Sequence, residues 1–98
     1  MTITKTQNGT SLTVAITGRV DTLTAPELDA DLTASLPTIT DLTLDFTHVD
    51  YLSSAGLRVL LSTQKKMNKQ GTMVLTHVSE PVMEVLTLTG FTDFLTIK

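Results

Sequence analysis

Two adjacent serines, Ser53 and Ser54, stand where a polar connection meets the start of a predicted helix. Free backbone N–H groups and the positive end of the helix dipole gather at such a position, so it stabilises an added negative charge. A phosphoryl group would add a charge of about −1.5 to −2 there. Capping the helix is the commoner role of a serine at this position. Spacing alone therefore leaves both functions open.

The serines lack the surroundings of a hydrolase nucleophile. No Gly-x-Ser-x-Gly elbow contains Ser53 or Ser54. The available bases, His48 and His77, follow predicted strands, where we expect surface loops. Because a triad needs a base and an orienting carboxylate held in place, this pattern does not predict catalysis. We expect that the protein is not an enzyme.

Three carboxylates, Asp21, Asp45 and Asp50, lie near the ends of predicted strands. Such a group could form an acid pair or bind a divalent cation. Asp is also a common turn and cap residue, and we favour that role here. The chain has no cysteine, which removes disulfides and thiolate metal sites. We expect no metal and no other cofactor.

The composition excludes several classes of partner. The net charge is −3 and aromatic residues make up only 4% of the 98 residues, so nucleic-acid binding is not expected. Apolar runs are too short to span a bilayer, and we expect no membrane contact. Lys65, Lys66 and Lys69 are interpreted as the solvated end of a helix. The length allows one domain, residues 1–98.

Alternation and turn residues predict a β-hairpin over residues 2–17. Asn8-Gly9 suits a type I′ turn, because both positions tolerate positive φ. In the second arm, one face is apolar and the other is rich in threonine, which suits a sheet. Further strands are expected at 42–46, at 73–75 and after Phe91.

Three helices are expected between these strands. The first begins at Thr24, where Thr24–Glu27 reads as a capping box, and its apolar stripe is Leu28, Leu32 and Leu36. The second runs from Ser53 or Ser54 to about Lys69. Ser79 is expected to cap the third helix, which Gly90 ends. The order β-β-α-β-α-β-α-β predicts an α/β fold with helices packed on a mixed, mostly parallel sheet.

Stretches distributed over the whole chain resemble the STAS domain family. Gly18–Thr22 with Thr24–Pro26 resembles the first loop and helix of that family. Val49–Leu61 is similar to its signature loop and second helix, and residues 79–91 resemble its closing helix. The most similar subgroup is the anti-sigma factor antagonists, which are small bacterial signal-transduction proteins.

That resemblance implies a cytoplasmic phosphoprotein that regulates transcription by partner switching. The unphosphorylated form would bind an anti-sigma factor of the GHKL type, which is also a serine kinase, and so release a sigma factor. Phosphorylation would break this complex, and a serine phosphatase would restore it. We expect the free domain to be a monomer.

The family motif, commonly Asp-Ser-Ser/Thr-Gly-Leu, assigns the phosphorylation to Ser54. Ser53 occupies the Asp position and is the second candidate acceptor. Asp21 matches the loop Asp that lies beside the acceptor. A partner could pack on Leu52, Ala55 and Leu57 where these are partly exposed. The expected partner-binding residues are Asp21, Thr22, Leu52, Ser53, Ser54, Ala55, Gly56, Leu57 and Arg58.

The resemblance also leaves a second function open. Some STAS domains are constitutive adaptors, in lipid-transport ABC systems or in stress-signalling complexes. They bind a partner without phosphorylation. Ser54 would then be a helix cap and little else.

Overall fold

A five-stranded sheet lies at the centre of the computed structural model, which describes all 98 residues. The strands lie side by side in chain order, so each connection leads to the neighbouring strand. β1 is antiparallel to β2, and the remaining neighbours are parallel. The strands are β1 (Thr2–Asn8), β2 (Ser11–Thr17), β3 (Asp41–His48), β4 (Thr72–Thr76) and β5 (Thr96–Ile97).

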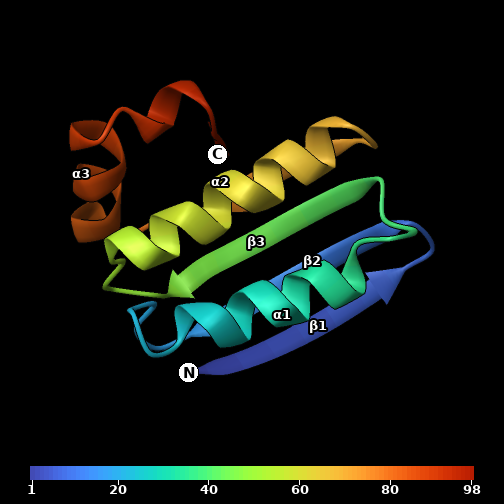
Figure 1. Cartoon of the computed structure of the whole chain (residues 1–98), viewed down its shortest axis with the longest axis horizontal. Coiled ribbons are helices and arrows are strands. Elements are labelled where there is room, and N and C mark those ends of the chain that lie inside the picture. The colour runs from blue at the N-terminus through green and yellow to red at the C-terminus, as the bar shows by residue number, and fades with distance from the viewer.

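Helices connect the parallel strands, as a parallel pairing requires. Figure 1 shows α1 and α2 lying along the same face of the sheet, with α3 beside the N-terminal end of α2. A short 3-10 turn follows α3 and leads into β5. The helical segments are α1 (Ala25–Ser35), α2 (Ser54–Asn68), α3 (Glu80–Leu88) and η1 (Phe91–Asp93).

The core fills the space between the sheet and the helices. Its strand side consists mainly of alternate residues of β2, β3 and β4, and Phe46 is the only aromatic residue of the core. Leu28 and Leu32 of α1 and Leu60 of α2 close it from the helix side, with no exposed surface. The other face of the sheet carries mainly threonine and stays largely exposed. The alternation of apolar and polar residues along the strands therefore indicates a sheet that is covered on one face only.

The predicted order of strands and helices is confirmed, and so is the mixed sheet. The hairpin turn differs from the prediction by one residue. Asn8 pairs with Ser11, which leaves Gly9 and Thr10 as the turn. Only Gly9 has positive φ, at 64°, so the turn is not of type I′, which needs positive φ at both positions.

Two of the predicted side-chain caps are wrong. Thr24 and Ser79 stand at the N-cap positions of α1 and α3, yet neither side chain caps its helix. The Thr24 hydroxyl bonds within the preceding loop instead, and the Ser79 hydroxyl donates to the carbonyl of Val49. Thr24 thus bonds within its own loop, whereas Ser79 bonds to a different loop, and each contact replaces the local cap. None of the helices has the length and apolar composition needed to cross a bilayer.

Phe46→Ala should destabilise the domain strongly, because it empties the largest fully buried side-chain volume. We expect a loss of about 3–5 kcal/mol in the free energy of unfolding, measured by denaturant titration. Thr13→Ala, on the exposed face of β2, is the control and should cost less than about 1 kcal/mol. Equal losses in the two variants would contradict the one-sided core.

Candidate functional site

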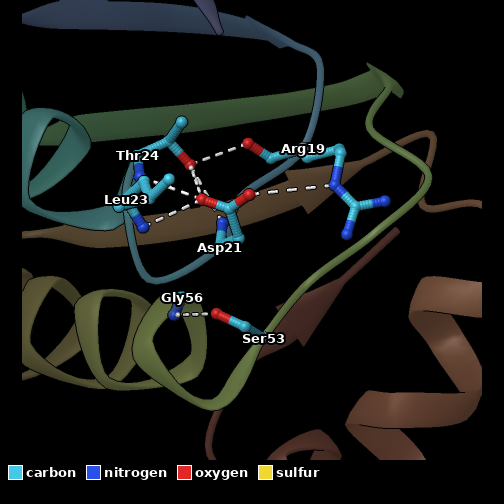
Figure 2. A network of polar contacts seen from close by, with 6 residues as sticks. All are labelled: Arg19, Asp21, Leu23, Thr24, Ser53 and Gly56. Carbon is cyan, nitrogen blue, oxygen red and sulfur yellow. Dashed lines mark hydrogen bonds and ion pairs between the residues drawn. The ribbon is translucent and has the colours of Figure 1, made fainter.

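The site forms where two loops meet at one end of the sheet. The β2–α1 loop and the β3–α2 loop are joined by an isolated parallel bridge between Val20 and Leu52. The N–H of Val20 donates to the carbonyl of Tyr51 (3.1 Å), and the N–H of Ser53 donates to the carbonyl of Val20 (2.9 Å). These bonds bring Asp21 and the two serines to one surface, as Figure 2 shows for Asp21 and Ser53.

The two serines have different surroundings. Ser53 is the N-cap of α2, and its Oγ accepts a hydrogen bond from the N–H of Gly56 (3.3 Å; Figure 2). Its side chain is half-buried, whereas Ser54 is exposed as the first residue of the helix. The helix has no acidic residue in its first turn, so no side chain of the helix itself places a negative charge at this end. Ser53 thus performs the capping, and the hydroxyl of Ser54 faces solvent.

Asp21 holds the β2–α1 loop together. Its Oδ1 accepts from the N–H groups of Leu23 and Thr24, each at 3.0 Å, and the Thr24 hydroxyl lies 3.1 Å away. The backbone N–H of Thr24, followed by that of Leu23 and the Thr24 hydroxyl, lowers the pKa of Asp21 below its ordinary value. The carboxylate is therefore ionised at neutral pH, and it organises the loop.

Three exposed residues beside this loop were not predicted as site residues. The Arg19 guanidinium stacks on the ring of Tyr51, 3.9 Å from its centroid, and its Nε lies 3.7 Å from Asp21. Leu23 is 88% exposed, which is unusual for a large apolar side chain. Leu23 had a signal in the sequence, because it is an apolar residue in a polar loop. The stacking of Arg19 on Tyr51 had no such signal, because these two residues belong to different loops.

Gly56 lets the two loops pack against each other. A Cβ at this position would lie 2.5 Å from Leu52 Cδ1 and 2.9 Å from Val20 Cγ1. Gly56 belongs to the first turn of α2 and is buried. Any larger residue would push the serine-bearing turn away from the β2–α1 loop.

The expected partner-binding residues divide into three groups by exposure. Thr22, Ser54 and Arg58 are exposed; Asp21, Ser53 and Ala55 are half-buried. Leu52, Gly56 and Leu57 are buried, so the condition of partial exposure that was set for direct contact is not met for Leu52 and Leu57. Their position indicates that they support the loop from inside, and only Ala55 of the three apolar candidates reaches the surface.

Of the other two carboxylates, Asp45 bonds within its own strand, β3, rather than in a turn, and Asp50 is exposed in the β3–α2 loop. Asp45 accepts from the N–H of Thr47 (3.0 Å) and contacts its hydroxyl, and His77 lies 3.4 Å away. The Thr47 hydroxyl and N–H lower the pKa of Asp45. His48 and His77 are both exposed, although His48 is the last residue of β3 rather than part of a loop.

Asp21→Asn should reduce stability at neutral pH and have less effect in acid. Since the folded-state pKa of Asp21 is lowered, its ionised form adds stability above the unfolded-state pKa. That contribution is lost as the pH falls through the folded-state pKa. Unfolding curves of both proteins between pH 7 and pH 2 would measure the shrinking difference. An NMR titration placing the Asp21 carboxyl at or above its ordinary pKa would contradict the assignment.

Gly56→Ala should separate the two loops. The added methyl must displace Leu52 or Val20, and overpacking of this kind costs about 1–3 kcal/mol. Thermal or denaturant unfolding would measure the loss. Ser62→Ala, two turns further along α2, should change stability by no more than about 0.5 kcal/mol. A Gly56→Ala protein as stable as the wild type would show that the loops tolerate a wider spacing.

Comparison with known proteins gives consistent matches. The STAS domain family matches residues 2–98. The anti-sigma-B factor antagonist of Bacillus subtilis (strain 168) is 33% identical over 93 residues, which are 94% of this chain and 85% of the relative. The anti-sigma-B factor antagonist of Listeria monocytogenes is 29% identical over 87 residues, covering 87% of this chain and 76% of the relative.

Solved structures agree in fold. An anti-sigma factor antagonist from Mycobacterium paratuberculosis superposes with a TM-score of 0.84 at 25% identity, covering 98% of this chain and 83% of that one. The unphosphorylated form of the anti-sigma factor antagonist SpoIIAA gives 0.85 at 14% identity, covering 99% and 88%. With the family match extending over nearly the whole chain, this protein belongs to the STAS domain family.

Proposed function

We propose that this protein is an anti-sigma factor antagonist. Its binding surface would be the paired loops with the first turn of α2. The names of its relatives in Bacillus subtilis and Listeria support this function. The surface is suited to binding rather than catalysis, because its carboxylate Asp21 is engaged by hydrogen bonds within its own loop. The unphosphorylated protein would bind an anti-sigma factor and so free a sigma factor.

We propose further that phosphorylation of Ser54 switches this binding off. The observation that carries the proposal is the division of roles between the two serines. Ser53 is held as the helix cap by the N–H of Gly56, whereas Ser54 is exposed at the first helical position. A kinase therefore reaches the Ser54 hydroxyl without breaking the cap. The kinase would be the anti-sigma factor itself, of the GHKL type, and a serine phosphatase would reverse the reaction.

A phosphate on Ser54 would act by charge and bulk, with no change of fold. The N-terminus of α2 offers unpaired N–H groups and a positive dipole, which stabilise the added anion in the free protein. The same anion would enter the interface and repel acidic groups of a partner. A Bacillus SpoIIAA in its phosphorylated form superposes on this chain with a TM-score of 0.77 at 13% identity, so that form has the same fold.

The proposal is tested with purified anti-sigma factors from the protein's own host. Isothermal titration calorimetry would measure binding of the wild type, Ser54→Ala, Ser54→Asp and the protein with genuine phosphoserine at position 54. We expect Ser54→Ala to bind as the wild type does. Ser54→Asp should bind at least about tenfold more weakly, a difference of 1.4 kcal/mol, and phosphoserine should weaken binding further because it carries more charge.

Ser53→Ala separates the cap from the switch. It should lower the free energy of unfolding by about 1 kcal/mol and still accept one phosphate on Ser54 from the kinase. Phosphopeptide mapping of the wild type would identify the modified serine. Phosphate on Ser53 of the wild type, together with an unmodified Ser53→Ala protein, would assign the acceptor to Ser53. Full binding of the anti-sigma factor by the phosphoserine protein would contradict the switch. Binding with no phosphorylation under any condition would assign the protein to the constitutive adaptors instead.

A further inference from the structure

The outer face of α2 carries an unusual concentration of positive charge. Four of the chain's seven basic residues belong to this helix or its C-cap, and no acidic residue does. The rest of the chain holds the other three basic residues and all ten acidic residues. We call this set the basic ridge; its members are Arg58, Lys65, Lys66 and Lys69.

The four cations gather on one surface. They line a single shallow depression of about 300 Å³ together with Ser62 and Leu61. Arg58, Lys65 and Lys69 are separated by seven and four positions, which places them along one line of the helix. All three are exposed, whereas Lys66 is half-buried. The ridge therefore runs from the first turns of α2 to its C-terminal end.

No residue of the ridge forms an ion pair within the protein. The three ion pairs of the structure involve Lys5, Arg19 and His77, none of which belongs to the ridge. Asp29 of α1 lies beside Arg58 in a second shallow depression, but the two form no ion pair. Lys66 donates to the hydroxyl of Thr33, which is uncharged.

Helix stability explains only part of the ridge. The helix dipole favours the lysines in the last turn. It does not favour Arg58, which lies near the positive end of the helix, where an acidic residue is the stabilising choice. Since no intramolecular partner is present, the cation at position 58 is available to a group outside the protein.

From this arrangement we infer that the basic ridge is the docking surface for an acidic face of the anti-sigma factor. The inference rests on the proposed function. It extends the proposed binding surface from the paired loops along α2. Ser54 begins the same helix, and Arg58 lies one turn further on. Complementary charge steers association and sets orientation, so an acidic partner face would align along α2 while its edge reaches the paired loops.

Other occupants fit the ridge less well. A membrane-bound helix presents a broad apolar face beside its cations, but Leu57, Leu60 and Met67 of α2 are buried in the core. Only Leu61, which is half-buried, lies among the cations of the ridge. A nucleic acid would meet a protein of net charge −3 with only these four cations in line. An acidic protein surface of similar length matches the ridge in both charge and extent.

The ridge also gives phosphorylation a specific target. Residues four apart on a helix are neighbours, so a phosphate on Ser54 would lie within reach of Arg58. A charge-assisted bond between them would neutralise the ridge at the end nearest the paired loops. The partner's acidic face would then lose an attractive cation and meet a new anion at the same place.

The test measures association of the anti-sigma factor with two double variants. Lys65→Gln/Lys69→Gln removes two charges from the ridge, and glutamine keeps a high helix propensity. The matched control, Thr6→Glu/Thr96→Glu, makes the same change of net charge on the exposed face of the sheet. Stopped-flow fluorescence would give the association rate constant of each protein between 50 and about 500 mM NaCl.

We expect the ridge variant to associate about tenfold more slowly at low salt and to depend less on salt. The control should stay within about twofold of the wild type. Equal rates for the ridge variant and the wild type would overturn the inference and leave the proposed function standing. Wild-type protein that binds no anti-sigma factor at any salt would overturn both.

A vesicle assay tests the lipid alternative. Wild-type protein and the ridge variant would be sedimented with vesicles of phosphatidylglycerol and phosphatidylcholine in equal amounts. We expect no sedimentation of either protein. Sedimentation of the wild type that the ridge variant loses would assign the ridge to an anionic lipid surface and overturn the inference.

Discussion

The close packing of the two loops at one end of the sheet is the constraint on which the site depends. A single parallel bridge, Val20 to Leu52, and two backbone hydrogen bonds hold loops that are about thirty residues apart in the chain. Gly56 makes this approach possible, because a methyl group there would clash with both bridge residues. Without that contact, Asp21 and the serines would lie on separate surfaces.

This packing separates structural from reactive groups within a few residues. Asp21 and Ser53 are engaged in hydrogen bonds that shape the loops, and Leu52 and Leu57 are buried beneath them. Ser54 and Arg58 are exposed along the helix that begins there. A modification of the exposed serine therefore changes the charge of the surface while the hydrogen bonds that hold the loops remain. That is the physical requirement of a switch that acts without refolding.

The fold was largely predictable, because hydrophobic periodicity is a local property. The alternation of apolar and polar residues over 11–17 indicates which face of the strand is buried. The four-residue spacing of Leu28, Leu32 and Leu36 does the same for the first helix.

The helix caps were less predictable. Thr24 sits in the motif of a capping box, but its hydroxyl accepts from the N–H of Asp21 and donates to the carbonyl of Arg19. The Asp21 carboxylate also accepts from the N–H of Thr24, the group that Glu27 would bind in a capping box. Local motifs fail where a neighbouring side chain offers a better bond.

By itself the sequence determined the order of the elements, the helix start at the serine pair and the family motif around it. The tertiary structure alone decided which serine caps and which is exposed, and that Leu52 and Leu57 face inward. It alone stacked Arg19 on Tyr51 and left the cations of α2 without an ion pair inside the protein. Periodicity and capping act within one or two turns of chain, whereas these contacts depend on the register that joins distant loops.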